Sequence, residues 1–315
     1  MTDRLPSVTV IIPARPDESQ VAAVAAARQM DYPAEKLEIL LARGRQPSVQ
    51  RNTALRAATG ELIYFLDDDS RPLPQNLRRA VEHFRDPAVQ MVGGPNLCPE
   101  DAPRLQQAFA LTMGSRLAFA SSCARYRSVG AVRASSEKEL ILCNLLARRA
   151  SVLELGGFDE SLYPNEENAL MDQLQKRGGT LLYDPALIVF RHPRATFRAF
   201  CKMLFTYGRG RAEQFRVLPT MGSALNFAPP LFCVYLLALP FLPKMLWWPL
   251  ALYGVAAVAQ ALTLLPARQL LRLPFLVFLI FLSHVCYGFG FWRGCVTSLR
   301  PPPAQVSAAV KLERA

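Results

Sequence analysis

Acidic residues are missing from a long stretch of this 315-residue sequence. After Glu213 no Asp or Glu appears until Glu313, and runs of Leu, Phe, Val and Ala fill the interval. A helix needs roughly 20 apolar residues to cross a bilayer. Three segments approach that length, and they are approximately Ala224 to Leu242, Leu246 to Leu265 and Leu273 to Trp292. Buried helices of a soluble protein are the alternative, but three such runs in succession favour a membrane region.

Basic residues around these segments bear on the membrane topology. Arg residues precede the first segment and separate the second from the third, so the positive-inside rule places both connections in the cytoplasm. Three crossings would then leave the basic tail outside, in conflict with the same rule. The number of crossings, two or three, therefore stays open. The beginning, MTDRLPSVTV, lacks an uninterrupted apolar stretch, so we expect the N-terminal region in the cytoplasm, at the inner (plasma) membrane of a bacterium.

The residues before the apolar region alternate between strand-like and helix-like segments. This alternation predicts an α/β fold, with a mostly parallel sheet and flanking helices. The expected strands are Val8 to Ile12, Leu37 to Leu41, Leu62 to Leu66, Val89 to Val92 and Glu139 to Leu146, and the expected helices are Val21 to Met30 and Val49 to Ala58. Leu105 to Ala120 fits either a core helix or an amphipathic helix on the membrane.

The formal net charge of +11 is compatible with nucleic acid, anionic lipid or an anionic substrate as partner. The sequence has no zinc-finger spacing, no basic heptad region and no aromatic-rich strand motif, and many Arg residues lie close to the apolar segments. We therefore expect a membrane partner and no nucleic acid. The 7 Cys residues include no CxxC pair, so we expect neither a disulfide framework nor a zinc site.

Three successive carboxylates, Asp67, Asp68 and Asp69, follow the apolar run Leu62 to Leu66. Three adjacent anions repel one another unless a counter-ion is present. Open α/β sheets bind ligands at the carboxyl ends of their strands, where the natural counter-ion is a divalent metal holding a diphosphate. Oxygen ligands favour Mg²⁺ or Mn²⁺. A solvated acidic turn that caps the next helix is the alternative.

Three stretches together resemble family 2 glycosyltransferases, which share the GT-A fold: SVTVIIPAR, RNTALRAATGELIYFLDDD and LGGFDESLYPNEENALMDQLQKRGG. The resemblance covers roughly residues 7–211 and extends to membrane-attached members, including those of exopolysaccharide assembly. It implies that Asp67 and Asp69 bind the diphosphate of the donor through the metal. Asp69 is the favoured direct ligand, and Asp68 occupies the variable middle position.

The resemblance also implies a nucleotide-binding loop. Pro13, Ala14 and Arg15 correspond to the family's nucleotide-facing loop, and Arg51 stands where a basic residue often approaches the nucleotide. A surface position is the alternative for Arg51. The family usually carries an Asp after the second strand, whereas this sequence reads EILLARGRQPS there. The identity of the base, and with it the donor, therefore stays open.

A second pair of acids, Glu166 and Glu167, precedes an expected helix. It resembles the family's ED motif, whose second acid deprotonates the acceptor hydroxyl. This implies Glu167 as the base, with Glu166 as the second candidate. A single base opposite a metal-bound leaving diphosphate implies one displacement with inversion. Alternatively, acids at a helix start stabilise the macrodipole by about 0.3 to 1 kcal/mol and need no catalytic role.

Two further groups of residues are binding candidates. Gly157, Phe158 and Asp159 belong to a GGFD segment that the resemblance places on the acceptor side. Arg209 and Arg211 precede the first apolar segment and suit a donor diphosphate or a lipid phosphate, because guanidinium groups match phosphate geometry. Stop-transfer charge at the membrane surface is the alternative for these two arginines.

We therefore expect a cytoplasmic GT-A domain over residues 1–200, an interfacial segment over 201–222, two to three transmembrane helices within 223–292 and a basic tail over 293–315. The expected reaction is inverting, metal-dependent transfer of a sugar from a nucleoside diphosphate sugar to a lipid-linked or saccharide acceptor, in cell-surface polysaccharide or glycolipid assembly. One alternative is a sugar nucleotidyltransferase, although PARPDESQV lacks the Gly-rich loop of that class. The other is a non-catalytic membrane scaffold with a decayed glycosyltransferase fold.

Overall fold

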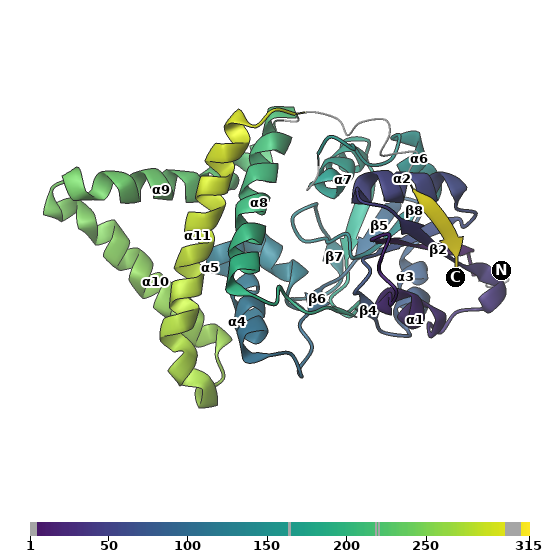
Figure 1. Ribbon diagram of the computed structural model, residues 1–315, viewed down its shortest axis with the longest axis horizontal. Helices are drawn as coiled ribbons and strands as arrows, with labels where there is room; N and C mark the ends of the chain where they lie inside the picture. The colour runs from purple at the N-terminus through teal and green to yellow at the C-terminus, as the bar shows by residue number, and fades with distance from the viewer. Residues whose placement is uncertain (1–4, 163–164, 218, 220, 300–309) are drawn as a thin grey trace. The chain divides into compact units, whose positions relative to one another are not determined.

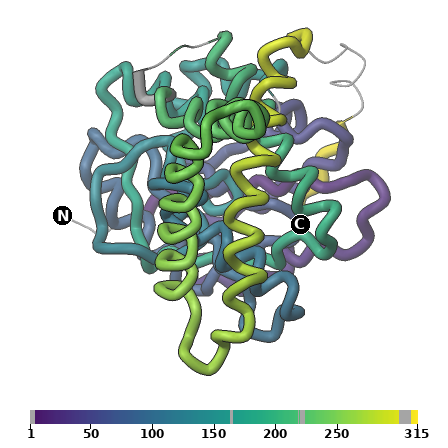
Figure 2. The backbone as a smooth tube through the Cα atoms, turned by 90° about the vertical axis from the view of Figure 1, so that its left-hand side faces the viewer, coloured from purple at the N-terminus to yellow at the C-terminus, as the bar shows by residue number. Residues whose placement is uncertain are grey.

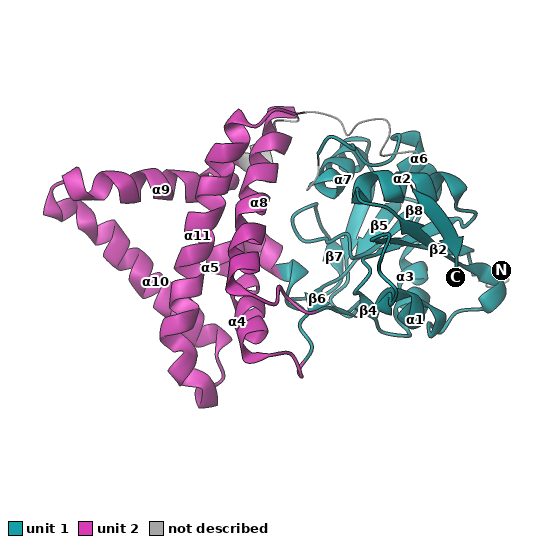
Figure 3. Ribbon diagram, in the orientation of Figure 1, with its two compact units in different colours: residues 1–99, 124–191, 300–315 teal, residues 100–123, 192–299 magenta. Residues whose placement is uncertain are grey.

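The computed structural model describes residues 5–162, 165–217, 219, 221–299 and 310–315 (Figure 1). The chain divides into two compact units (Figure 3). Residues 1–99, 124–191 and 300–315 make up the first unit, and residues 100–123 and 192–299 make up the second. The chain therefore leaves the first unit twice and returns to it twice. The expected domain boundary at residue 200 falls inside helix α8 (Phe197–Val217) of the second unit.

The first unit is built on an eight-stranded mixed sheet with the strand order β11-β2-β1-β3-β8-β5-β9-β7. Strands β1, β2, β3, β5 and β9 run in one direction, and β7, β8 and β11 run in the other. The strands are β1 Val8–Ala14, β2 Leu37–Arg43, β3 Leu62–Leu66, β5 Val89–Gly93, β7 Arg133–Ala134, β8 Asn144–Arg148, β9 Thr180–Tyr183 and β11 Lys311–Arg314. The predicted α/β fold is confirmed.

One predicted strand was misplaced. The expected strand from Glu139 to Leu146 begins only at Asn144 and continues to Arg148. The amide of Asn144 donates to the carbonyl of Ile141 in a turn, so the preceding residues do not enter the sheet. Leu140 and Leu142 are nevertheless buried in the core, which explains the apolar pattern.

Helices cover both faces of this sheet. Side chains alternate along a strand, so Val10 of β1 belongs to one hydrophobic cluster and Ile11 to the other. The cluster with Val10 packs against α1 and α3, and the cluster with Ile11 packs against α2, α6 and α7. These helices are α1 Ala22–Arg28, α2 Pro47–Ala57, α3 Asn76–His83, α6 Arg149–Glu154 and α7 Glu166–Lys176. A second, three-stranded sheet has the order β4-β10-β6, formed by Arg71–Pro72, Val189–Phe190 and Asn96–Leu97.

The second unit is helical. Its α-helices are α4 Arg104–Met113, α5 Arg116–Phe119, α8 Phe197–Val217, α9 Ala228–Ala238, α10 Trp248–Leu264 and α11 Leu273–Val296. In Figure 1, α9, α10 and α11 form three sides of a triangle, and Figure 2 shows α10 and α11 joined by the turn at 267–272. The expected helix from Leu105 to Ala120 is two helices, α4 and α5, and α5 packs with α10 and α11.

Helices α8 and α11 approach closely through glycines. A Cβ atom added to Gly208 would lie 2.0 Å from the carbonyl oxygen of Tyr287, and one added to Gly290 would lie 2.0 Å from that of Phe205. Only glycine fits at such contacts, because any side chain would force the two backbones apart.

Three helical stretches are long and apolar enough to cross a membrane: Ala224–Phe241, Lys244–Leu264 and Ala267–Val296. They match the three predicted segments closely. The structure buries only 17%, 11% and 22% of their most apolar windows, so most of this surface has no partner among the described residues.

Candidate active site

The loops that follow β1, β2 and β3 emerge at one edge of the sheet. These strands are parallel, with Ile11 opposite Phe65, so their carboxyl ends lie at the same level. The Ala23 amide, in the first turn of α1, donates to the backbone oxygen of Asp68 (3.0 Å). The buried Gln50 side chain of α2 donates to the carbonyls of Ala14 (2.8 Å) and Ala42 (2.5 Å). Pro13 and Ala14 of the predicted nucleotide loop are the last two residues of β1, and β1 pairs with β3, which ends directly before the Asp triplet.

Arg51 connects the two predicted acidic clusters. It lies on α2, which Gln46 caps by accepting from the amides of Ser48 and Val49. The guanidinium is buried, with Nη2 2.8 Å from Asp67 Oδ1 and Nη1 3.1 Å from Glu166 Oε1. The alternative of a surface position for Arg51 is thereby excluded.

Arg191 is the residue that sequence reasoning missed. It follows β10, whose pairing with β4 brings it beside the turn after β3. Its Nη1 lies 2.9 Å from Asp67 Oδ2, and its Nε lies 2.6 Å from Asp69 Oδ1. Burial alone would lower the pKa of Arg191, but the two carboxylates hold it well above its ordinary value. No sequence pattern marks Arg191, because its partners Asp67 and Asp69 are more than a hundred positions away.

These contacts form a row of alternating charge that we call the charge row: Glu166, Arg51, Asp67, Arg191 and Asp69. Asp68 has no ion pair among the described residues. Burial, together with the neighbouring Asp69 and Asp67, raises the pKa of Asp68.

The charge row bears on whether this site suits a metal. Carboxylate oxygens of Asp67 and Asp69 converge on one cationic group, the Arg191 guanidinium, and such oxygens are the ligands that Mg²⁺ and Mn²⁺ prefer. Across the part of the chain that the structure describes, no three His, Cys, Asp or Glu side chains form a metal-binding group. The two acids fit a divalent ion shared with a phosphate, and their role as ligands stays a prediction.

Glu166 and Glu167 differ sharply in their surroundings at the start of α7. Glu166 is 2% exposed and paired with Arg51, and burial followed by repulsion from Glu167 raises its pKa. Glu167 is half-buried, and among the described residues its carboxylate has no hydrogen bond or ion pair. Asn165 before them has a φ of 105°, unusual for a residue other than glycine, and its side chain accepts from Asn168 (2.8 Å).

The GGFD segment is tied to α2 by Asn52. This side chain donates to the carbonyl of Phe158 (2.8 Å) and accepts from the Phe158 amide (2.8 Å). A Cβ on Gly157 would lie 2.4 Å from Asn52 Oδ1, and Gly157 has a φ of 85°. The Phe158 ring is buried, with its edge against Phe65 of the core.

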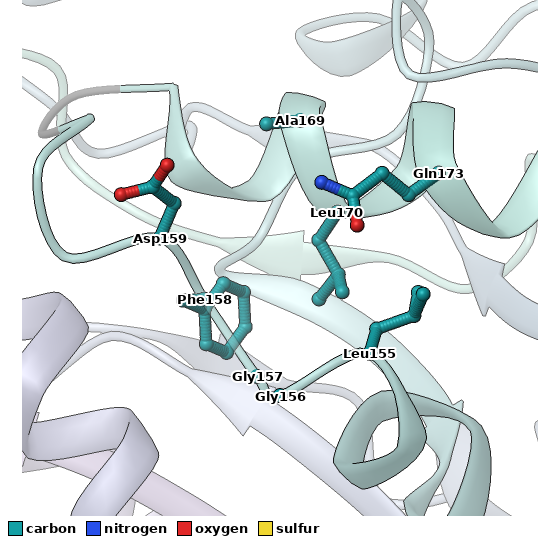
Figure 4. Close-up of a pocket in the computed structure, with 8 residues that line it drawn as sticks. All are labelled: Leu155, Gly156, Gly157, Phe158, Asp159, Ala169, Leu170 and Gln173. Carbon is teal, nitrogen blue, oxygen red and sulfur yellow. The ribbon is translucent and has the colours of Figure 1, made fainter.

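A cavity of about 210 Å³ lies between this loop and α7 (Figure 4). Its lining residues are Leu155, Gly156, Gly157, Phe158, Asp159, Ala169, Leu170 and Gln173. The Asp159 carboxylate accepts from the amide and hydroxyl of Ser161, which holds it at the end of the loop. A role of this segment on the acceptor side stays a prediction.

Arg209 and Arg211 belong to the second unit. On α8, Arg209 Nε lies 3.4 Å from Glu213 Oε1, and Arg211 Nη1 donates to Gln214 (3.1 Å). The charge row belongs to the first unit. Their phosphate-binding role stays a prediction.

This sheet edge, with its paired acids, is typical of a GT-A glycosyltransferase. The family model of glycosyl transferase family group 2 matches residues 62–291, and the chain belongs to this family. A solved mannosyltransferase from Pyrobaculum calidifontis, in complex with GDP-Man and Mn²⁺, shares the fold with a TM-score of 0.55 and 18% identity, over 93% of this chain and 88% of that one.

Two curated relatives match part of the chain. The pre-mycofactocin glycosyltransferase of Mycobacterium tuberculosis is 27% identical over 177 residues, 53% of this chain and 34% of the relative. The succinoglycan biosynthesis protein ExoA of Rhizobium meliloti is 27% identical over 152 residues, 47% of this chain and 46% of the relative. The match therefore spans about a third of one relative and about half of the other.

Proposed function

We propose that the chain transfers one sugar, with inversion, from a nucleoside diphosphate sugar to a hydroxyl of a lipid-linked or saccharide acceptor at the cytoplasmic face of a bacterial inner membrane. The observation that carries the proposal is the difference in pairing between two adjacent glutamates at the start of α7. Arg51 engages Glu166, whereas the adjacent Glu167 carries a carboxylate with no ion pair among the described residues. Glu167 is thus the group available to accept a proton.

In this mechanism the acceptor hydroxyl oxygen attacks the anomeric carbon of the donor. Its proton passes to the Glu167 carboxylate, and the bond between the anomeric carbon and the diphosphate oxygen breaks. A bound Mg²⁺ or Mn²⁺, held by Asp67 and Asp69, would stabilise the charge on the leaving diphosphate. The Arg51 guanidinium pairs with both Asp67 and Glu166. It therefore holds the acids proposed to bind the donor in a fixed position relative to the start of α7.

The donor assignment is supported by the fold relationship to a mannosyltransferase solved with GDP-Man and Mn²⁺. The acceptor assignment is supported by the succinoglycan relative and by the three apolar helices, which would keep the enzyme beside lipid-linked substrates. The family assignment argues against the nucleotidyltransferase alternative.

The test compares Asp69→Asn and Glu167→Gln with Glu35→Gln, a control on an exposed carboxylate before β2 that lies outside the site. Purified protein is incubated with Mn²⁺, radiolabelled UDP- and GDP-sugars and membrane lipid extract. We expect Glu167→Gln to lose at least about a hundredfold in transfer with unchanged UDP or GDP binding. Asp69→Asn should lose Mn²⁺-dependent nucleotide binding as well.

Full transfer by Glu167→Gln would overturn the base assignment. Absence of nucleotide binding by the unaltered protein would favour the non-catalytic scaffold.

A further inference from the structure

Strand β11 closes the sheet next to the predicted nucleotide loop. It pairs antiparallel with β2, with Lys311 opposite Arg43 and Arg314 opposite Leu40. In Figure 1 this strand is the yellow arrow at the C-terminus, beside β2. The amide of Ala315 also donates to the carbonyl of Ile39 (3.1 Å). Because the other side of β2 pairs with β1, the segment that follows the apolar helices forms the outer strand beside the donor edge.

Apolar side chains anchor this strand. Leu312 and Val310 pack against the hydrophobic cluster that contains Leu40 and Leu55. Val310 Cγ2 would lie 3.4 Å from a Cβ atom at Gly44, directly after β2. The strand is therefore held by core packing as well as by backbone hydrogen bonds.

One side chain of β11 reaches the loop through Arg43. Glu313 Oε2 lies 2.9 Å from Arg43 Nε. The same guanidinium donates through Nη1 to the carbonyls of Glu18 (2.7 Å) and Arg15 (3.3 Å), both in the β1–α1 loop. Arg43 thus ties the loop to the tail strand, and its side chain is only 18% exposed.

We infer that β11 is part of the donor site: Glu313 orients Arg43, and Arg43 fixes the loop from Arg15 to Glu18 in the conformation that receives the nucleotide. Glu313 and Arg43 are positioning residues in this scheme. The inference rests on the proposed function, because that loop faces a nucleotide only if the chain binds a nucleoside diphosphate sugar. It also means that the segment beyond the apolar helices contributes to donor affinity.

The experiment measures binding of UDP, GDP and dTDP, each with Mn²⁺, to the full chain in detergent. Glu313→Gln keeps the size of the side chain and removes its charge, and we expect about two- to fivefold weaker binding. Arg43→Met removes both loop contacts and should weaken binding about tenfold or more. Turnover at saturating donor should be unchanged, because neither side chain belongs to the charge row.

Arg314→Gln is the matched control. It removes an ion pair of the same strand, to Glu38 at 3.4 Å, which lies away from the loop. We expect its binding and its melting temperature to match the unaltered protein. Melting temperatures of all variants separate loss of affinity from loss of fold.

The outcomes are distinct. If the unaltered chain binds one nucleotide and Glu313→Gln and Arg43→Met, both folded, bind it equally well, the role of β11 is overturned while the proposed donor survives. If the unaltered chain binds none of the three nucleotides, the proposed function fails and this inference fails with it.

Discussion

Arg51 is the residue on which the two acidic clusters depend. It is buried and shared between Asp67 and Glu166, and Glu166 is buried as well. A buried carboxylate that loses its only cation carries an uncompensated charge, which costs far more than the pair contributes when intact. Removal of both partners leaves no such charge.

The first prediction follows from this difference between the loss of one partner and the loss of both. Arg51→Met should lower the free energy of unfolding by about 3 to 5 kcal/mol. The double variant Arg51→Met/Glu166→Gln should recover most of that loss, since the buried charge is gone. Denaturant unfolding of the single and double variants measures both values. A double variant as unstable as Arg51→Met would contradict the explanation.

Asp184 supplies a second prediction, about pH. Its carboxylate is buried, yet hydrogen bonds from His83 (2.8 Å) and Arg79 (2.7 Å) outweigh burial and lower its pKa to about 2. A carboxylate whose folded pKa lies below the ordinary 3.8 stabilises the fold above about pH 4, and that contribution is lost as the pH falls towards 2.

Asp184→Asn should therefore cost about 1 to 2 kcal/mol near pH 7 and much less near pH 2. Melting temperatures measured across this range, with Asp159→Asn as an exposed control, give the comparison. An equal loss at both ends of the range would mean that the charge of Asp184 is not responsible.

At the scale of elements, the sequence is informative where strands are long and apolar. Strand β3 begins and ends at the predicted residues, and it delivers Asp67 to the edge that a parallel arrangement requires. Strand β10 has two residues and β11 reads KLER, so neither shows a period that could mark it as a strand. The contacts of Arg191 and Glu313 depend on these short strands, which tertiary pairing alone defines.

The α8–α11 contact supports a third prediction. Gly290→Ala should destabilise the second unit by about 1 to 3 kcal/mol, because the new methyl group would meet the Phe205 carbonyl. Gly254→Ala in α10 is the control, since nothing lies within 4 Å of its added Cβ and alanine favours helix. Thermal unfolding in one detergent compares the two, and equal stability of both variants would exclude a tight crossing.

For the whole molecule, β11 restricts the membrane topology. The chain leaves the first unit after Arg191, and β11 joins the eight-stranded sheet of that unit at Lys311. A bilayer cannot pass through a hydrogen-bonded sheet, so we predict that any crossings between Arg191 and Lys311 are even in number. The conflict between three crossings and a basic tail disappears under this condition.

The positive-inside rule then selects the pair that crosses. Arg268 and Arg272 lie between α10 and α11, and the basic tail follows α11. We therefore predict that α9 and α10 cross as a hairpin and that α11 does not, which places all of these basic residues on the cytoplasmic side. The packing of α11 against α8 agrees, because α8 carries Arg198, Lys202, Arg209, Arg211 and Arg216, which are unfavourable in the hydrocarbon core.

The fourth prediction tests this topology directly. Epitope tags are placed after Ala315, beside Gln269 and beside Met245, the last in the turn between α9 and α10. In spheroplasts with an intact inner membrane, we expect antibody to reach only the Met245 tag, and permeabilisation should expose the other two. A tag after Ala315 that is accessible from outside would contradict the β11 pairing in the membrane-bound enzyme. If instead no tag is reached before permeabilisation, the three helices lie at the surface without crossing, which keeps the even number but removes the hairpin.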